Sequence, residues 1–308
     1  MRICLKILVT GSEGFVGKNV SNFLEEKGIH VIRTDINSSE INGDIKDENF
    51  VFNQLFGIDF DGMVHLAALA NLRTTTSNPY LCYKTNSLGT LNMLELAKRK
   101  NVQKFVYASS ANVYGSPSRV PVTEHSSLAP RLPYDHSKVI GEEFVRSYNR
   151  NHGLPTVILR SWKLFGEYDT MEAAIPRFIK ACLKNEEISL FNGGRDTTDP
   201  YHIENYCNAI HLCLTHNKAS GEIFNIGSGE EISIRSLAEY VKRILNAKSE
   251  LKNCPPRSIL ESEPMRSYPS IAKIKNMLGY LEIIKFEEGI RRTIKWISNE
   301  NADVLALK

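Results

Sequence analysis

Two residues near the middle of the chain have the types and spacing of a proton-transfer pair. Tyr134 and Lys138 are four residues apart, so a helix that begins near Tyr134 places both on one face, one turn apart. An ammonium group held there favours the phenolate, so the phenol can exchange a proton near neutral pH although free tyrosine titrates at about 10. This spacing alone is common on surface helices, so the catalytic interpretation depends on the neighbouring motifs.

A pair of serines supplies the hydroxyl that such a site needs. Residues 105–108 (FVYA) are typical of a buried strand, and Ser109 and Ser110 follow them directly. Open α/β sheets bind their ligands at the carboxyl ends of their strands. A hydroxyl, a phenol and an ammonium group gathered there can relay the proton of an alcohol that is being oxidised to a ketone.

The N-terminal segment has the order of elements that binds a dinucleotide. A strand over 3–10 runs into the loop GSEGFVG at 11–17, and a helix over 18–27 leads to a second strand over 29–34. Asp35 ends that strand and can accept hydrogen bonds from the adenosine ribose hydroxyls. Its charge would repel a 2′-phosphate, so the sequence predicts NAD rather than NADP.

Each glycine of the loop has a physical role in this interpretation. Gly11 permits the tight turn, Gly14 lets the backbone approach a pyrophosphate, and Gly17 lets the helix pack close to the strand. The N–H groups at the start of the helix can then bind the phosphates, and Phe15 and Val16 of the loop are further candidate cofactor-binding residues. A glycine pattern in this strand–loop–helix context is far more specific than the pattern alone.

Three weaker signals give further candidate contacts to the cofactor. The motif GDI at 43–45 offers a carboxylate for the adenine amino group and an apolar side chain for its face. A strand and turn over 61–68 lets the backbone pass close to a cofactor, and a helix over 80–100 carries an asparagine soon after that turn. The candidate residues are Asp44, Ile45, Leu66, Ala67, Ala68 and Asn86.

Composition excludes several other classes of protein. The chain has 308 residues, 42% of them hydrophobic and 24% charged, and a net charge of +3 that favours neither nucleic acid nor an anionic membrane as a partner. No apolar run approaches the roughly 18 residues of a membrane span. The six cysteines form no Cys-x-x-Cys motif and the eight histidines show no ligand spacing. We therefore expect no metal site and a cytoplasmic protein.

The order of predicted elements indicates the fold class. A further strand over 155–160 follows the helix of Tyr134, and the βα alternation up to there predicts an α/β fold with a Rossmann-type, doubly wound parallel sheet. Beyond Gly166 we predict helices over 174–184, 203–215, 236–245 and 271–278, and strands over 188–191 and 222–227. The predicted NAD-binding domain covers 1–165, with parts of 196–228. A smaller, partly interleaved substrate domain covers most of 166–308.

These motifs, in this order, resemble the extended short-chain dehydrogenase/reductases that act on nucleotide sugars, and most closely the UDP-glucose 4-epimerases. The matching features are GSEGFVG, Asp35, GDI, HLAAL at 65–69, NSLGTLNML, ASSANVYG, the Tyr134/Lys138 pair and NIGSG at 225–229. The resemblance implies that Ser110, Tyr134 and Lys138 carry the chemistry, with Ser109 beside the nicotinamide and with Tyr134 and Lys138 also contacting NAD. It further implies a nucleotide-sugar substrate and a homodimer formed through helices at 80–100 and 137–151.

Two positions depart from the family pattern, and both concern the substrate. Family members carry an asparagine in an Arg-x-x-Asn-x-x-Gly run where this chain has Lys163, and an arginine before an Asp-Phe pair where it has Thr198. Other cationic side chains must therefore hold the substrate diphosphate. The candidate substrate-binding residues are Ser110, Lys163, Phe191, Arg195 and Arg257.

The two residues after Ser110 bear on the reaction type. Dehydratases of the family carry an Asp-Glu pair there, which protonates the leaving 6-hydroxyl and takes the C5 proton. This chain has Ala111 and Asn112, neither of which exchanges a proton at neutral pH. The resemblance thus favours a 4-epimerase over a 4,6-dehydratase or a 4-keto-sugar reductase. A non-catalytic NAD-binding protein is a third alternative, disfavoured because the serine, tyrosine and lysine are all present.

Overall fold

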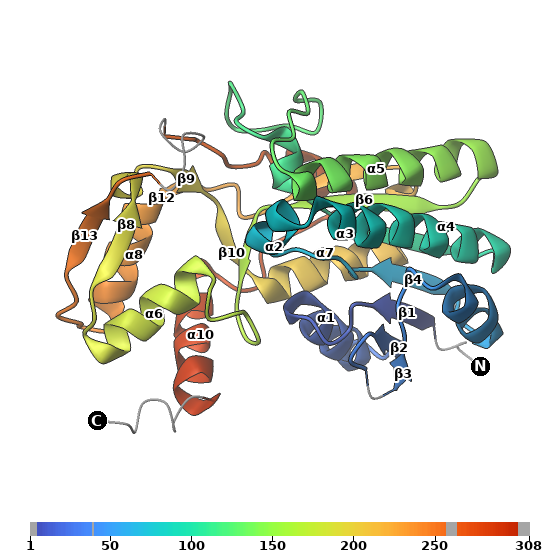
Figure 1. Ribbon diagram of the computed structural model, residues 1–308, viewed down its shortest axis with the longest axis horizontal. Coiled ribbons are helices and arrows are strands. Elements are labelled where there is room, and N and C mark those ends of the chain that lie inside the picture. Colours follow the sequence, from blue (N-terminus) through green and yellow to red (C-terminus); the bar gives the residue numbers. More distant parts are fainter. Residues whose placement is uncertain (1–4, 39, 257–263, 301–308) are drawn as a thin grey trace.

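A parallel sheet of seven strands runs through the larger part of the molecule (Figure 1). The structure is a computed structural model that describes residues 5–38, 40–256 and 264–300. The strand order is β11-β6-β5-β4-β1-β2-β3, and every pair is parallel. The order reverses between β1 and β4, which is where sheets of this kind bind dinucleotides. The strands are β1 (Lys6–Thr10), β2 (His30–Asp35), β3 (Ile41–Asn42), β4 (Gly62–His65), β5 (Lys104–Ser110), β6 (Thr156–Ser161) and β11 (Ile223–Ile226).

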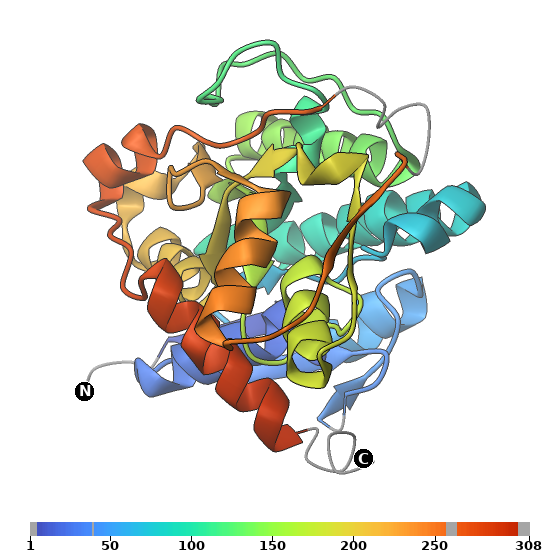
Figure 2. The ribbon, with the colours of Figure 1, turned by 90° about the vertical axis from the view of Figure 1, so that its left-hand side faces the viewer.

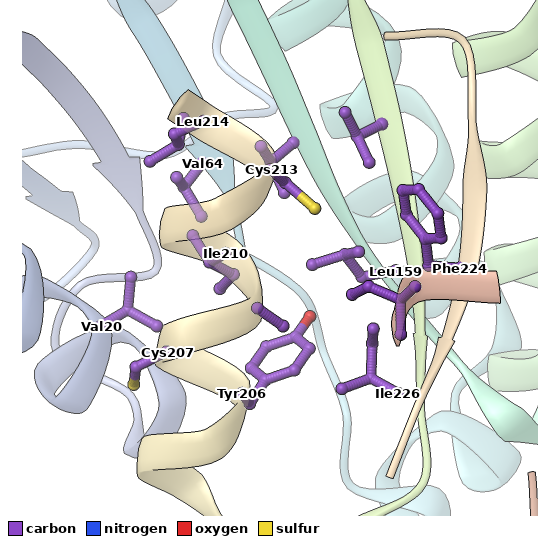
Figure 3. Packing of buried hydrophobic residues seen from close by; sticks show 14 of the residues in the cluster. Val20, Val64, Leu159, Tyr206, Cys207, Ile210, Cys213, Leu214, Phe224 and Ile226 are labelled. Atoms are coloured by element: carbon purple, nitrogen blue, oxygen red, sulfur yellow. The ribbon is translucent and has the colours of Figure 1, made fainter. Parts of the chain in front are cut away.

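Helices cover both faces of the sheet, because successive side chains of each buried strand point to opposite faces. Ile7 and Val9 pack on one face with α1 (Phe15–Glu26), α7 (Ile203–Thr215) and α9 (Ala272–Leu278). Leu8 packs on the other face with α4 (Gly89–Arg99) and α5 (Pro133–His152). Figure 3 shows Tyr206, Ile210 and Cys213 of α7 beside Val64 and Leu159 of the sheet. The predicted doubly wound α/β fold is confirmed.

A second group of elements lies toward the viewer in Figure 2 and has an apolar core of its own. This core contains Phe178 and Ile179 of α6, Leu237 and Val241 of α8, and Ile290 of the last helix. The elements are α6 (Ala174–Lys184), β8 (Ile188–Phe191), α8 (Ile234–Ile244), β13 (Leu251–Cys254) and α10 (Phe286–Glu300). Two short strand pairs join the parts: β7 (Lys163–Phe165) with β10 (Pro200–His202), and β9 (Thr197–Thr198) with β12 (Ile232–Ser233).

Several boundaries differ from those predicted. Helix α1 begins at Phe15 and not at 18, so the last glycine of the loop belongs to its first turn. The predicted single helix over 80–100 consists of α3 (Pro79–Tyr83), a π-helical turn at Lys84–Leu88, and α4. The helices α2 (Leu72–Ser77) and α10 and the strand β13 were not predicted.

The remaining short helical segments are Phe50–Gln54, Leu55–Gly57, Ala111–Tyr114, Asn192–Gly194 and Asn217–Ala219. The segment Ala111–Tyr114 bears on the site, because it follows β5 directly. Ser110 is its N-cap, and the Ser110 hydroxyl accepts a hydrogen bond from Asn112 N at 3.2 Å. This contact helps to hold the serine in place at the carboxyl end of the sheet.

Candidate active site

Strand β5 and helix α5 bring the three predicted catalytic residues together. Ser110 is the last residue of β5, and α5 begins at Pro133, a residue whose fixed φ suits the first helical position. The Asp135 carboxylate accepts hydrogen bonds from the N–H groups of Arg131 (3.1 Å) and Leu132 (2.9 Å), which stabilises the helix start. Tyr134 therefore lies in the first turn, and Lys138 follows one turn later.

Lys138 is almost completely buried, at 4% exposure, and its ammonium group is held between the strand and the tyrosine. The Nζ atom donates to the Ala108 carbonyl oxygen at 2.8 Å and lies 5.8 Å from the centre of the Tyr134 ring. Burial lowers the pKa of Lys138 to about 8, while Cys82 and Glu142 act in the opposite direction. The side chain thus titrates close to physiological pH.

Tyr134 itself has a raised pKa. Loss of water around the phenol raises it to about 12, although a hydrogen bond with Ser110 acts to lower it. The prediction that Lys138 brings this pKa toward neutrality is wrong, because desolvation outweighs the other influences and the ammonium group is directed at the Ala108 carbonyl.

The glycine loop passes the physical tests for a phosphate site. Gly11 has a φ of +72°, and a Cβ atom there would lie 2.7 Å from Ala67 N, so only glycine lets the loop approach the turn after β4. Helix α1 starts after Gly14 with no side-chain cap and no acidic residue in its first turn. Its N–H groups and positive dipole end can therefore bind an anion. Ser12 Oγ is buried there, with no partner among the described residues.

Asp35 lies at the carboxyl end of β2 and faces the glycine loop. Its two carboxylate oxygens accept hydrogen bonds from Glu13 N at 3.3 Å and Asn37 N at 3.0 Å. Each oxygen can accept a further bond, since an ionised carboxylate has about four lone-pair sites. The residues of this region therefore fit the adenosine and pyrophosphate of a dinucleotide.

The weaker cofactor candidates have partners within the protein. Asp44 forms an ion pair with Lys46 (2.9 Å), and Ile45 is buried close to Gly89, where a Cβ atom would lie 2.6 Å from it. Asn86 donates to the Leu69 carbonyl (3.0 Å) and to Ser137 Oγ (2.9 Å), and it accepts from Leu69 N (2.7 Å). This amide therefore connects the turn after β4 to α5. Direct contact of these three side chains with NAD stays a prediction.

The predicted substrate residues lie in different elements. Lys163 is exposed on β7, Phe191 ends β8, and Arg195 is exposed beyond it and donates to Asn192 Oδ1 at 2.7 Å. Arg257 lies outside the described residues. A pocket of about 490 Å³ adjoins Arg195 and is lined by Asn192, Gly193, Arg195, Arg235, Asn253, Cys254 and Pro256. Arg235 was not predicted from the sequence.

Two buried carboxylates near the site were also missed. Glu142 is fully buried one turn beyond Lys138, and this i, i+4 spacing on the same helix was the available signal. Asp169, at 7% exposure, has one oxygen without a partner among the described residues, and burial raises its pKa to about 6 against the influence of Lys163. No sequence pattern marked Asp169.

Within the described residues, no three His, Cys, Asp or Glu side chains are grouped so that they could hold a metal ion. No helix in this part of the chain is both long and apolar enough to cross a membrane.

Comparisons with known proteins agree with this geometry. Residues 7–227 match the model of the NAD dependent epimerase/dehydratase family. A Methanocaldococcus jannaschii protein, provisionally named a UDP-glucose 4-epimerase, is 34% identical over 96% of this chain and 99% of its own.

Two solved structures are similar over nearly their whole length. The UDP-glucose 4-epimerase of Thermotoga maritima, determined with UDP-glucose, has a TM-score of 0.90 and 27% identity, covering 96% of this chain and 99% of that one. A dTDP-glucose 4,6-dehydratase of Streptomyces venezuelae, determined with NAD, has a TM-score of 0.87 and 28% identity, covering 97% and 98%. The chain therefore belongs to the NAD dependent epimerase/dehydratase family of nucleotide-sugar enzymes, and its cofactor is NAD.

Proposed function

We propose that the protein is a nucleotide-sugar 4-epimerase of the UDP-glucose/UDP-galactose type. The observation that carries this proposal is which groups at the carboxyl end of β5 can exchange a proton. Ser110, Tyr134 and Lys138 gather at the carboxyl end of the strand, whereas Ala111 and Asn112, the next two residues, offer no acid or base. The site thus has a relay for oxidation at C4 and lacks an elimination pair at these positions.

In the proposed reaction Tyr134 exchanges the O4 proton. During oxidation the C4–H bond breaks with its electron pair, the O4 proton passes to the Tyr134 oxygen, and a C4 carbonyl forms. Bound NAD supplies the hydride acceptor for this half and the hydride donor for the next, and a positive charge in its oxidised form. Ser110 hydrogen-bonds the phenol throughout, and Tyr134 returns the proton to O4 when hydride reaches the other face of the 4-keto sugar.

Lys138 contributes charge and position and does not touch the transferred proton in this scheme. Its ammonium group, held at the Ala108 carbonyl, lies close enough to the Tyr134 ring to favour the phenolate electrostatically. The raised pKa of Tyr134 means that this lysine alone is insufficient. Oxidised NAD, when bound, would add its positive charge to that of Lys138.

The substrate is assigned to the second group of elements. We place NAD on residues 1–165 with parts of 196–228, and the nucleotide sugar mainly on 166–308. The entry of β11 into the main sheet and the separate core around α6 and α8 support this division. Lys163, Phe191 and Arg195 are the proposed substrate contacts, because two of them are exposed cations and Phe191 is only partly buried.

We also propose that the protein is a homodimer and lies in the cytoplasm. A homodimer through the 80–100 and 137–151 segments is supported by Tyr80 and Leu88, which are 74% and 38% exposed on the first of them. The five described cysteines are unpaired, as in proteins of a reducing cytoplasm. Sedimentation of the purified protein tests the dimer.

Turnover assays on a panel of UDP-, dTDP- and GDP-sugars, with NMR spectra of the products, test the function. The expected result is interconversion of at least one sugar with its C4 epimer, without added reductant. Failure to convert any sugar of the panel, in protein shown to bind NAD, would contradict the proposal.

A further inference from the structure

A buried carboxylate lies directly behind the proposed reaction centre. Glu142 is on α5, one turn after Lys138, and is completely buried. The Arg160 guanidinium binds it through two parallel hydrogen bonds, Nε to Oε1 at 2.9 Å and Nη2 to Oε2 at 2.6 Å. Two-point pairing of this kind fixes the orientation of both side chains. The Glu142 side chain is therefore held in a single orientation.

The same carboxylate also holds the end of β5. Ser109 Oγ donates to Glu142 Oε1 at 2.5 Å, and Ser109 is the register partner of Arg160 in the neighbouring strand. Ser110 follows Ser109 directly, and side chains alternate in direction along a strand. The bond to Glu142 thus fixes the backbone from which Ser110 projects, relative to the helix that carries Tyr134 and Lys138.

Further hydrogen bonds anchor the arginine. Arg160 Nη1 donates to Tyr114 OH at 2.7 Å and to the Glu124 carbonyl at 3.3 Å. Tyr114 OH in turn donates to Asn225 Oδ1 at 2.7 Å, on the edge strand β11. The cluster therefore connects α5 with three adjacent strands at the end where the reaction centre lies.

Glu142 is also the anion among the groups that act on Lys138. From the other packed elements Lys138 faces His65 of β4, Tyr107 of β5 and Cys82 of α3. Burial keeps all three neutral near pH 7, since it lowers the pKa of His65 to about 3 and raises those of Tyr107 and Cys82.

Two charged groups of the neighbourhood act elsewhere. Asp135, on α5, acts on Tyr134 and Cys82. Arg160 is occupied by Glu142 and opposes its charge. Lys138 therefore experiences the net charge of the Glu142–Arg160 pair.

We propose that Glu142 is a positioning residue of the reaction centre, which holds Ser110, Tyr134 and Lys138 in their mutual geometry and helps to keep Lys138 protonated. This inference rests on the proposed oxidation at C4 and is independent of the later steps, because an epimerase and a 4,6-dehydratase both begin with that oxidation. The test must therefore observe the oxidation alone.

The experiment measures single-turnover reduction of bound NAD by an accepted nucleotide sugar, followed by the absorbance of the reduced cofactor. The variants are Glu142→Gln and the double variant Glu142→Gln/Arg160→Met. The double variant leaves no unpaired buried charge, and such replacements are often tolerated when single ones are not. The matched control is Glu143→Gln, because Glu143 is the next residue, is 60% exposed and pairs with Arg146. Circular dichroism and NAD titration verify folding and cofactor binding.

We expect both Glu142 variants to oxidise sugar at least about tenfold more slowly, since misplacing a catalytic group by about 1 Å can cost on the order of 10²-fold. The KM and the NAD affinity should change by less than about threefold. The oxidation rate is also measured as a function of pH. The alkaline limb of this pH profile should move to lower pH in Glu142→Gln and return toward its original position in the double variant. A merely structural residue would not produce this reversal, and Glu143→Gln should match the wild type in every readout.

A wild-type oxidation rate in the folded, NAD-binding double variant would overturn the inference and leave the proposed function intact. An alkaline limb that stays in place in Glu142→Gln would overturn the part played by charge. If no nucleotide sugar of the panel reduces the NAD bound to the wild-type protein, the proposed function is overturned and this inference with it.

Discussion

Raising the pH should inactivate the enzyme well below the ordinary titration range of lysine. Lys138 has a pKa lowered to about 8 by burial, whereas an unperturbed lysine titrates at about 10.4. One pH unit above its pKa only about a tenth of the ammonium form remains, so turnover should fall roughly tenfold per unit beyond about pH 8. The neutral amine that remains can still donate to the Ala108 carbonyl, so the rate falls because the positive charge is lost.

The assay measures kcat/KM for an accepted nucleotide sugar from about pH 6 to about pH 10. Lys138→Arg is the informative variant, because a guanidinium group keeps its charge up to about pH 12. Its maximal rate should be lower, since its planar group does not fit the site of an ammonium, and its alkaline limb should move to higher pH. A wild-type profile that is flat to about pH 10 would refute the reasoning.

Unfolding cannot produce this limb through Lys138. The pKa of this lysine is lower in the folded state than in the unfolded state, so between about pH 8 and about pH 10.4 the unfolded chain binds more protons. The contribution of Lys138 to the free energy of unfolding therefore rises across that window. Thermal unfolding at each pH checks that activity is lost while the fold is retained.

Three substitutions test the other assigned roles. Tyr134→Phe should keep the fold and NAD binding but lose on the order of 10²-fold or more in turnover, because the general acid/base is deleted; near wild-type turnover would reject the assignment. Asp35→Ala should weaken NAD binding by about 10- to 100-fold, since a hydrogen bond to a charged group is worth about 1.5–3 kcal/mol, and it should reduce the preference over NADP. Titration of the wild type would contradict this role if NADP bound more tightly than NAD. Lys163→Ala should raise the KM for the nucleotide sugar by roughly 1.4- to 5-fold without changing NAD affinity, because an exposed ion pair is worth about 0.2–1 kcal/mol. An unchanged KM would make Lys163 an ordinary surface lysine.

The cofactor half of the fold was predictable because its local signals agree with one another. The order of strand, glycine loop, helix and terminal acid at Asp35 is confirmed, as is a helix that begins near Tyr134 and places Lys138 one turn later. Each of these features depends on residues that are close together in the sequence. The close approach of Gly11 to Ala67, in the turn after another strand, was not predicted from the sequence.

The properties that the sequence did not reveal depend on tertiary packing. The pKa of Tyr134 follows from how much water the folded site excludes, and no spacing of residues reports that. Arg160 and Ser109 meet Glu142 only because β5 and β6 pair in one register. The sequence did not predict α10, whose apolar face, including Ile290 and Ile297, packs on α6.

The central claim, that the enzyme epimerises at C4 without elimination, is tested most directly by turnover in deuterated water. The products of an accepted nucleotide sugar are analysed by mass spectrometry and NMR. Because Ala111 and Asn112 supply no acid or base for elimination, we predict conversion to the C4 epimer with unchanged mass and no deuterium at C5. A product lighter by one water, or one labelled at C5, would contradict the epimerase assignment and favour a dehydratase whose acid and base lie elsewhere in the site.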